Sequence, residues 1–229
     1  MTPPLIIAHR GASAEKPENT LVAFQRALAL EVDGIELDVH LTRDGVPVVF
    51  HDPALKRLTG ARGRIARKTW KELQALRVRD REPIPRLVDV LRLTRGLAVV
   101  QIEIKAGPVS PILHAIQAAR ATEWVILASF DVRLVAKARI LAPRIPRMLI
   151  SNGKPAPVAL LRKLAACGAA GLSVDYRAIH SAAWIGHFQA RGYSVWSWTV
   201  NDPAVARRLA GWGIDALLGD DPALMQRMV

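Results

Sequence analysis

The sequence of 229 residues has one cysteine, few aromatic residues and no long apolar run. The single cysteine, Cys167, excludes an internal disulfide and a metal site built from several cysteines. It lies in "LAACGAAG", where we expect an inert core residue. Every apolar run is shorter than the ~18 residues that a membrane-spanning helix needs. The sequence therefore predicts neither a membrane span nor a disulfide scaffold.

Signals for export and for specific nucleic-acid binding are also missing. The start, MTPPLIIAHRG, has no basic n-region, and its apolar run is too short for a signal peptide, so we expect a cytoplasmic protein. Acidic residues are outnumbered 20 to 32, which gives a net charge of +12. The basic residues are scattered and lack interleaved aromatic residues. We expect a solvated basic surface with no specific nucleic-acid partner and only weak association with anionic membranes.

Short apolar runs alternate with helical patterns along the chain, which predicts a single α/β domain over 1–229. The number of units favours a TIM (β/α)8 barrel, and an open doubly wound sheet is the alternative. Strands are expected at 5–8, 34–39, 46–50, 98–104, 124–128, 147–150, 170–174, 193–199 and 214–218. Helices are expected at 19–30, 69–76, 86–94, 110–121, 132–141, 156–167, 181–191 and 203–212.

The alternation fails over 52–86, which is long, polar and basic. We interpret this segment as an insertion with a small helix that covers one end of the barrel. Its apolar residues Trp70, Leu73 and Leu76 have helical spacing, so we expect them to pack down onto the barrel.

Two expected core strands carry acidic residues on one face. In "GIELDVH", Glu36 and Asp38 alternate with apolar residues, and in "VVQIEIKA", Glu103 and Lys105 do the same. In a barrel, the apolar faces pack on the helices and the polar faces point inward, near the end where active sites lie. Three converging carboxylates repel one another, so they raise their pKa values or bind a hard cation such as Mg²⁺ or Ca²⁺. The alternative is that each carboxylate pairs with an arginine or lysine.

Two other strands end in histidine, His9 after "LIIA" and His51 after "VVF". Such a pair suits general acid–base catalysis, although a surface or capping histidine would give the same pattern. Trp196 and Trp198 share one face of a late strand, and Trp198 stands nearer its end. Aromatic residues within strands are usually core, and Trp198 can also form an apolar wall of a pocket.

The motifs "AHRGASAEKPENTLVAFQRAL", "GIELDVHLTRDGVPVVFHDPALKRLTG", "IEIKAG", "SFD" and "WTVNDP" together resemble the glycerophosphodiester phosphodiesterase family. The resemblance runs from residue 7 to the end of the chain. It implies a TIM barrel with a small insertion after the second or third strand, which corresponds to 52–86. It also implies that Glu36, Asp38 and Glu103 hold a divalent metal ion, Mg²⁺ or Ca²⁺.

The resemblance further implies roles for five residues that match the family's motifs. His9 and His51 would act as general acid and base, in an order that the sequence leaves open. Arg10 and Lys105 match positions that hold the phosphate, and Trp198 matches a tryptophan that lines the pocket. The implied reaction hydrolyses glycerophosphodiesters to sn-glycerol 3-phosphate and an alcohol such as choline or ethanolamine, through a cyclic phosphate.

Two further motifs of this resemblance lie outside the residues given a role in the reaction. The family's "PENT" stretch, here 17–20, is expected mainly to shape the first turn, with Asn19 or Thr20 as helix cap. The family's Thr-Asp-x-Pro is replaced by Gly219-Asp220-Asp221-Pro222, which leaves the role of that loop open.

Three functional hypotheses follow. The first is hydrolysis of water-soluble diesters, and the charge of the basic insertion predicts a preference for anionic head groups, with glycerophosphoinositol and glycerophosphoglycerol as the expected substrates. The second is lysophospholipase D-type cleavage of lysolipids on the same scaffold, favoured by an apolar lip on 52–86 or by a basic cap at an anionic membrane. The third is a non-catalytic barrel that binds polyanions.

Overall fold

The computed structural model describes residues 2–152 and 155–228 and forms a closed barrel of parallel strands. β1 pairs with β2 and places His9 opposite Glu36, which closes the ring. This closure confirms the TIM barrel and excludes the open doubly wound sheet. The barrel strands, in chain order, are β1 (Leu5–His9), β2 (Gly34–Leu41), β6 (Val99–Ile104), β7 (Val125–Ser129), β8 (Arg147–Ser151), β9 (Gly171–Asp175), β10 (Ser194–Trp198) and β11 (Ala216–Gly219).

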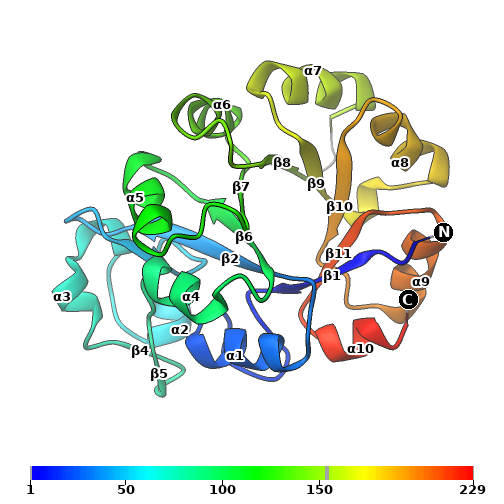
Figure 1. Ribbon diagram of the computed structural model, residues 1–229. Helices are drawn as coiled ribbons and strands as arrows, with labels where there is room; N and C mark the ends of the chain where they lie inside the picture. The colour runs from blue at the N-terminus through cyan, green and yellow to red at the C-terminus, as the bar shows by residue number, and fades with distance from the viewer. Residues whose placement is uncertain (1, 153–154, 229) are drawn as a thin grey trace.

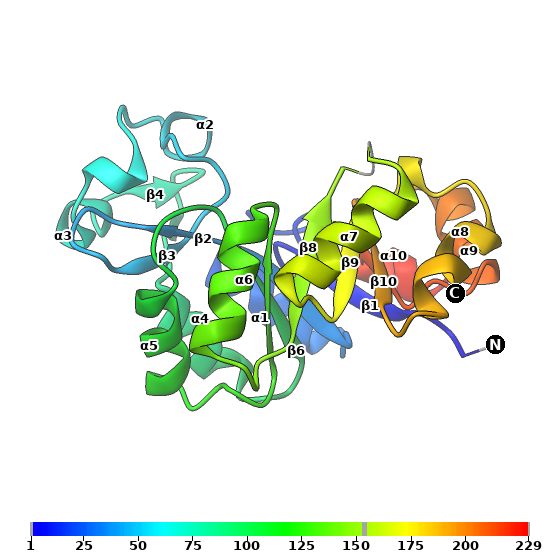
Figure 2. The ribbon, with the colours of Figure 1, turned by 90° about the horizontal axis from the view of Figure 1, so that it is seen from above.

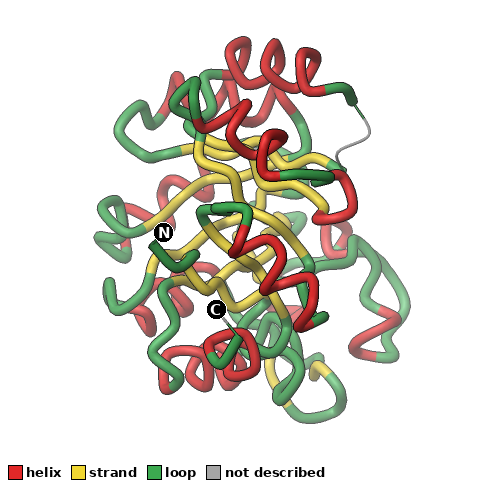
Figure 3. Tube along the Cα trace, turned by 90° about the vertical axis from the view of Figure 1, so that its right-hand side faces the viewer, coloured by secondary structure: helices red, strands yellow, loops and turns green. Residues whose placement is uncertain are grey.

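Helices surround the strands as an outer layer, as Figures 1 and 3 show. Within the described ranges, no helix has the length and apolar character needed to cross a bilayer. The longer helices are α1 (Leu21–Ala29), α4 (Leu87–Thr94), α5 (Ser110–Ala118), α6 (Val132–Leu141), α7 (Pro157–Cys167), α8 (Ala182–Gln189) and α9 (Pro203–Gly211). Two short elements are not predicted by the sequence pattern: η2 (Tyr176–Ala178), which follows β9, and α10 (Pro222–Gln226), which follows β11 and completes the ring of helices.

Short polar residues and prolines explain where these helices begin. Thr20 accepts a hydrogen bond from the first turn of α1, which decides between the two expected caps. Asp131 and Asp202 cap α6 and α9 in the same way. Pro157 and Pro203 occupy the first helical position, where the missing N–H costs nothing. These local signals place each helix on the outside of the strand that precedes it.

The alternation along the strands divides the apolar side chains between two cores. Ile35 and Leu37 of β2 point outward and pack in one buried cluster with Phe24 of α1 and Leu91 of α4. A smaller cluster on the inward face fills the barrel: Ile7, Ala128, Met148, Ile150, Trp196, Ala216 and Leu218. The polar residues of β2 and β6 therefore face the barrel interior, as their alternation predicts.

The chain leaves the barrel after β2 and forms a separate group of short elements, which Figure 2 shows beside β2. The expected strand 46–50 is β3 (Pro47–Val49), which pairs antiparallel with β2 and lies outside the barrel. The other elements are α2 (Lys56–Thr59), η1 (Ile65–Arg67), α3 (Trp70–Leu73), β4 (Arg77–Val78) and β5 (Glu82–Pro83).

This group has an apolar cluster of its own, which includes Val48, Phe50 and Leu73. Leu73 is fully buried, and Trp70 and Leu76 are partly buried against the cluster. The helix is shorter than expected. The expectation that these residues pack onto the barrel is also wrong, because the short elements of the insertion bury them in an apolar cluster of their own. The short basic stretches between them stay in solvent.

Candidate active site

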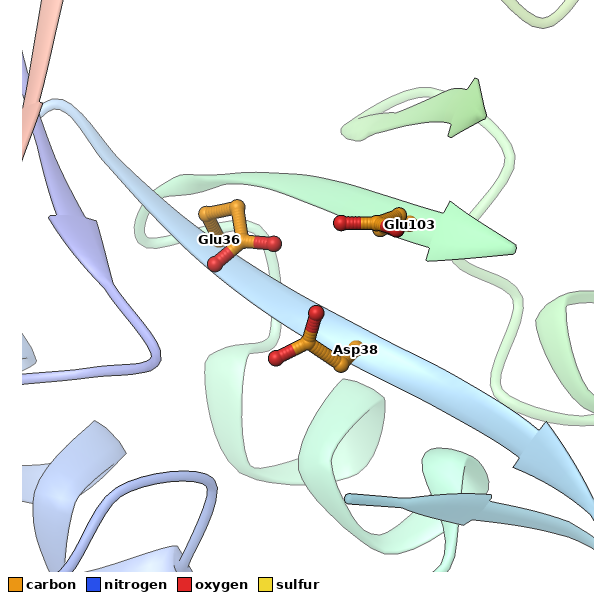
Figure 4. Close-up of side chains that lie close together, drawn as sticks. All are labelled: Glu36, Asp38 and Glu103. Carbon is orange, nitrogen blue, oxygen red and sulfur yellow. The ribbon is translucent and has the colours of Figure 1, made fainter. Parts of the chain in front are cut away.

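Three buried carboxylates lie together on the inward face of the barrel. Glu36 and Asp38 come from β2 and Glu103 comes from β6, and Asp38 stands directly opposite Glu103 in the strand register. One carboxylate oxygen of each lies within 4.8 Å of the others. Figure 4 shows the three side chains turned toward one another. The two acidic strand faces thus converge on one point.

The carboxylates differ in charge state. Burial, with repulsion from Asp38 and Glu103, raises the pKa of Glu36 well above its ordinary value. Burial also raises the pKa of Glu103, to about 7. At Asp38 the neighbouring Lys105 and Arg10 overcome burial and lower the pKa. The cluster therefore holds more acidic groups than its own cations neutralise.

Two of the three carboxylates form ion pairs with neighbouring cations, so the alternative interpretation, in which each carboxylate pairs with an arginine or lysine, holds in part. Lys105 Nζ lies 2.7 Å from an oxygen of Asp38 and 2.7 Å from one of Glu103. Arg10 Nε lies 3.2 Å from the second oxygen of Asp38. Among the described residues, Glu36 has no ion pair with a lysine or arginine. Fully ionised, the three carboxylates would exceed the two cations by one negative charge, and their hard oxygen atoms suit a divalent ion such as Mg²⁺ or Ca²⁺.

Arg10 is held in a strained conformation just beyond the end of β1. Its φ of 57° lies in the left-handed region, which is uncommon for a side chain of this size. Its N–H donates to Glu36 and its carbonyl accepts from the N–H of Asn19. Gly11 follows at φ 81°, where a Cβ would lie 2.7 Å from the backbone of Ala23. The tight turn aims the guanidinium at Asp38.

His9 ends β1, and a carboxylate fixes its ring. Its Nδ1 lies 2.7 Å from Asp220 Oδ1, and Nε2 is 3.9 Å from Glu36. Burial alone would raise the pKa of Asp220, but the bonds from His9 and Asn201 hold it at about 2. An ionised carboxylate only accepts, so Nδ1 carries the hydrogen and Nε2 faces the pocket.

His51 follows β3 and has a similar partner. Its Nδ1 lies 2.6 Å from Asp52 Oδ1, and its backbone carbonyl lies 2.9 Å from His40 Nε2. Arg57 donates to both oxygens of Asp52 and, with His51, lowers the pKa of that carboxyl to about 2. Burial lowers the pKa of His51, and the charge of Asp38 offsets only part of that effect. The His51 ring is thereby fixed and largely neutral.

Alternating charges connect the insertion to the first loop. Arg57 donates to Glu18 at 2.8 Å, and Glu18 also accepts from Arg10 at 2.8 Å. Asn19 donates to Asp38 at 2.8 Å. The expectation that 17–20 mainly shapes the first turn is therefore wrong for two of its residues. Glu18 and Asn19 contact charged side chains of the site, and Arg57, although exposed, is also an ion-pair partner of Glu18 and Asp52.

All of the predicted site residues except Asp38 line one cavity of about 120 Å³ at the carboxyl ends of the strands, and Asp38 contacts them from below. Trp198 and Phe130 form its apolar wall, packed edge to face at 5.9 Å between ring centroids. The buried polar atoms of Gln101 and Ser173 and Trp198 Nε1 have no hydrogen-bond partner in the described structure. Unsatisfied buried polar groups are rare, so these atoms mark a place for a polar ligand.

Sequence reasoning missed Ser173 and the role of Asp220. Ser173 lies between the apolar residues Leu172 and Val174 of β9, a pattern that core serines share. Asp220 follows the last strand of a barrel, where site residues gather, and that position was the available signal. The preceding Gly219 leaves no room for a side chain, because a Cβ there would lie 2.5 Å from the Val200 carbonyl oxygen and against Met225. Close packing of α10 therefore explains the glycine in this motif.

A model of the glycerophosphoryl diester phosphodiesterase family matches residues 9–224. The chain belongs to this family. It is therefore an enzyme of the phosphodiester hydrolase class, as its motifs predict. The glycerophosphodiester phosphodiesterase of Caldanaerobacter subterraneus is 32% identical over 240 residues, which cover 98% of this chain and 97% of the relative.

Solved structures of this family have the same fold. An Oleispira antarctica phosphodiesterase in complex with the product sn-glycerol-3-phosphate superposes with a TM-score of 0.92 at 27% identity, covering 99% of this chain and 96% of that one. A glycerophosphodiester phosphodiesterase from Agrobacterium tumefaciens gives a TM-score of 0.86 at 26% identity, covering 98% and 99%. The match over nearly the full length of each chain confirms the barrel fold.

Proposed function

We propose that this enzyme hydrolyses glycerophosphodiesters to sn-glycerol 3-phosphate and an alcohol, with a divalent metal ion and two histidines. One observation carries the proposal: a single cavity is lined by buried carboxylates, two carboxylate-oriented histidines, Arg10 and Lys105. The relatives' activity and the product bound to the Oleispira structure support the choice of substrate.

Glu36, Asp38 and Glu103 are the residues that would hold the metal ion. A bound divalent ion supplies Lewis-acid stabilisation of the negative charge that builds up on the phosphoryl oxygens. The raised pKa values of Glu36 and Glu103 mean that both would lose their protons when the ion binds. Lys105 would remain beside Asp38 and Glu103 as a second positive charge.

The two histidines would move the protons. One Nε2 accepts the proton of the glycerol 2-hydroxyl as its oxygen attacks phosphorus, and the bond from phosphorus to the head alcohol breaks. The other Nε2 donates a proton to that leaving oxygen. The resulting cyclic phosphate is opened when water adds to phosphorus with the histidine roles reversed. Asp220 and Asp52 keep both Nε2 atoms turned to the substrate, since each binds the opposite ring nitrogen.

The remaining site residues would bind and orient the diester. Arg10 and Lys105 offer donors and positive charge to the phosphoryl oxygens. Trp198 and Phe130 would cover the carbon atoms of the glycerol, and the unpartnered amide of Gln101 would receive one of its hydroxyls. Each of these contacts satisfies a group that the described structure leaves without a partner or partly desolvated.

Lysolipid cleavage is the second candidate, and the surface gives it little support. An apolar lip on 52–86 would favour it, yet Trp70, Leu73 and Leu76 pack inward. Of the described residues, the exposed large apolar side chains are Leu5, Leu97, Phe130, Ile140, Leu141 and Val158, which all lie outside that segment. The completeness of the cavity also argues against a barrel that only binds polyanions.

The test is release of glycerol 3-phosphate from glycerophosphocholine, measured with Mg²⁺, with Ca²⁺ and with a chelator. We expect metal-dependent release by the wild type and its loss on chelation. Release unaffected by exhaustive chelation would contradict the metal part of the proposal. No release with either ion, together with cleavage of lysophosphatidylcholine, would replace the proposal with the lysolipid activity. Polyanion binding without hydrolysis of either substrate would favour the non-catalytic alternative.

A further inference from the structure

A second, larger cavity opens beside the first at the barrel mouth. Its volume is about 580 Å³, and it shares His9 and Arg10 with the catalytic cavity. The remaining lining residues come from the first loop, the insertion and the loops after β10 and β11: Ser13, Ala14, Glu18, Arg79, Asn201, Asp220, Asp221 and Leu224. The two cavities therefore meet at a histidine and an arginine that both face the reaction site.

Two adjoining cavities fit a phosphodiester, which has a glycerol on one side of the phosphate and a head alcohol on the other. If the proposed function holds, the scissile phosphate lies at His9 and Arg10, because one would transfer a proton and the other would bind phosphoryl oxygens. The glycerol then occupies the smaller cavity, beside the carboxylates and Trp198. The head alcohol on the far side of the phosphate has the larger cavity available to it.

Most charged groups that line the larger cavity are already engaged. Glu18 accepts from Arg10 and Arg57, and Asp220 accepts from His9 and Asn201. Arg79 differs, since its guanidinium has no ion pair or hydrogen bond within residues 2–152 and 155–228. Its backbone is fixed all the same, with φ at 48° and the N–H donating to Leu58 at 2.7 Å. The backbone therefore anchors Arg79 beside the cavity, and its guanidinium is a cationic donor without a partner among the described residues.

The chemistry of the lining distinguishes among head alcohols. No tryptophan, tyrosine or phenylalanine of the described chain lines the cavity, so it lacks the aromatic faces that typically bind a quaternary ammonium group. Arg79 and Ser13 offer donors. Asp221 uses one oxygen to cap α10 and leaves the other as an acceptor. Donors and acceptors around a roomy polar cavity suit neighbouring hydroxyl groups.

We propose that this cavity is the head-alcohol subsite, that it selects uncharged polyol head groups, and that Arg79 is a specificity-determining residue. The proposal rests on the proposed function and adds the substrate class. It keeps the two expected substrates but for a different reason, because glycerol and inositol are uncharged polyols and not anions, whereas choline and ethanolamine carry a positive charge. Arg79 repels those cations and donates hydrogen bonds to hydroxyls.

The test compares kcat/KM for glycerophosphoglycerol, glycerophosphoinositol and glycerophosphocholine at 150 mM salt or more, where long-range charge effects are screened. The variants are Arg79→Ala and Arg79→Gln, with Arg81→Ala as a matched control. Arg81 is also an exposed arginine of the insertion, but it does not line the cavity. The wild type should prefer the two polyol diesters. Arg79→Ala should lower the ratio of polyol to choline activity roughly fivefold, the effect of losing one hydrogen bond.

The outcomes separate the subsite from the function it rests on. Equal losses on all three substrates in both Arg79 variants would overturn the subsite, because they would place Arg79 against the common glycerol phosphate. An equal effect of Arg81→Ala would also overturn it, since a general basic field would explain the preference. A ratio unchanged in both Arg79 variants, with normal melting temperatures, would do the same while leaving the phosphodiesterase intact. Failure of the wild type on every diester would instead remove the proposed function.

Discussion

The barrel mouth has a charged arc and an uncharged arc. The charged arc consists of β1, β2, β6 and the residues that follow them, and it lines the catalytic cavity with His9, Arg10, Glu36, Gln101, Glu103 and Lys105. The uncharged arc runs from β7 to β11, and it contributes Phe130, Ile150, Ser173, Trp198, Thr199 and Leu218. Both arcs belong to one closed sheet, but one lines the cavity with charged and polar side chains and the other with mostly apolar ones.

The charged residues are grouped on one side of the barrel mouth because the strands that carry them are neighbours in the sheet. β2 pairs with β1 on one side and with β6 on the other, which sets Glu36 between His9 and Gln101 in the register. Buried charges must lie close to opposite charges, because isolated charges in a low-dielectric interior are costly. Grouping them on neighbouring strands meets that requirement and leaves the other strands free to form an apolar wall. The comparison predicts that changes on the charged arc affect turnover and that changes on the uncharged arc affect binding.

The largest effect is expected from the histidines. His9→Ala and His51→Ala should each lower kcat roughly 10²- to 10⁴-fold, because each removes a group that we propose transfers a proton. His114→Ala, at an exposed position on α5, is the control and should leave kcat within about twofold. The measurement is release of glycerol 3-phosphate under saturating substrate. Full turnover by either variant would remove that histidine from the chemistry.

In the absence of metal, the carboxylates should make the stability of the protein depend on pH. The pKa of Glu103 is raised in the folded protein from its ordinary value of 4.5 to about 7. A raised carboxyl pKa means that the folded state binds the proton more tightly, so this contribution to stability is present below pH 4.5 and is lost as pH rises through 7. We therefore expect the wild-type melting temperature, measured in chelator, to fall as the pH rises from 4.5 to 7. The melting temperature of Glu103→Gln, which has no carboxyl group to titrate, should fall by a few degrees less over the same range.

Metal ions should reverse that trend. Added Mg²⁺ or Ca²⁺ should raise the wild-type melting temperature, and more at pH 8 than at pH 5, because binding displaces protons from the cluster. Glu103→Gln should respond less. Identical melting curves for wild type and variant at every pH, with and without metal, would show that Glu103 neither titrates in this range nor binds the ion.

Asp220 connects the two arcs, because it follows β11 of the uncharged arc and its carboxylate binds His9 of the charged arc. Asp220→Asn should lower kcat roughly 10- to 100-fold, the effect of losing a charged hydrogen bond, with little change in KM. Asp220→Glu should recover part of the rate. Asp202→Asn, at a capping carboxylate of α9, is the matched control. A rise in KM alone would mean that Asp220 shapes the binding site instead of orienting the histidine.

The smallest effect is expected on the uncharged arc. Trp198→Phe keeps an aromatic ring against Phe130 but removes the N–H that has no partner in the described structure. KM should rise roughly fivefold while kcat changes less than twofold, as expected for a contact made equally in ground and transition states. Steady-state kinetics with glycerophosphocholine would measure this split. A loss in kcat with unchanged KM would break the distinction between the arcs.

The charged arc could be predicted from sequence because it violates the apolar pattern of buried strands. Glu36, Asp38 and Glu103 interrupt runs that otherwise read as core, and parallel strands bring such residues to one end of the sheet. The barrel itself follows from the strand–helix alternation. Its closure through β1 and β2 does not, because a long-range strand pair leaves no local mark in the sequence.

The remaining features could not be predicted, and the reasons are physical. Phe130 resembles an ordinary apolar residue at the end of a strand, and Ser173 resembles an ordinary buried serine. The link from Asp220 to His9 spans 211 positions in the chain, so no spacing rule can indicate it. The strand over 46–50 was identified, but its antiparallel partner and its place outside the barrel depend on the turn at Asp44–Gly45 and on the insertion that follows.

Under the proposed function, the charged arc cleaves the bond between phosphorus and the head alcohol. Phosphorus NMR of glycerophosphocholine, incubated with a stoichiometric amount of metal-supplemented enzyme, tests it most directly. We predict a transient five-membered cyclic phosphate followed by sn-glycerol 3-phosphate, with free choline as the other product. Phosphocholine and glycerol as products would contradict the account, because the opposite bond would then have broken.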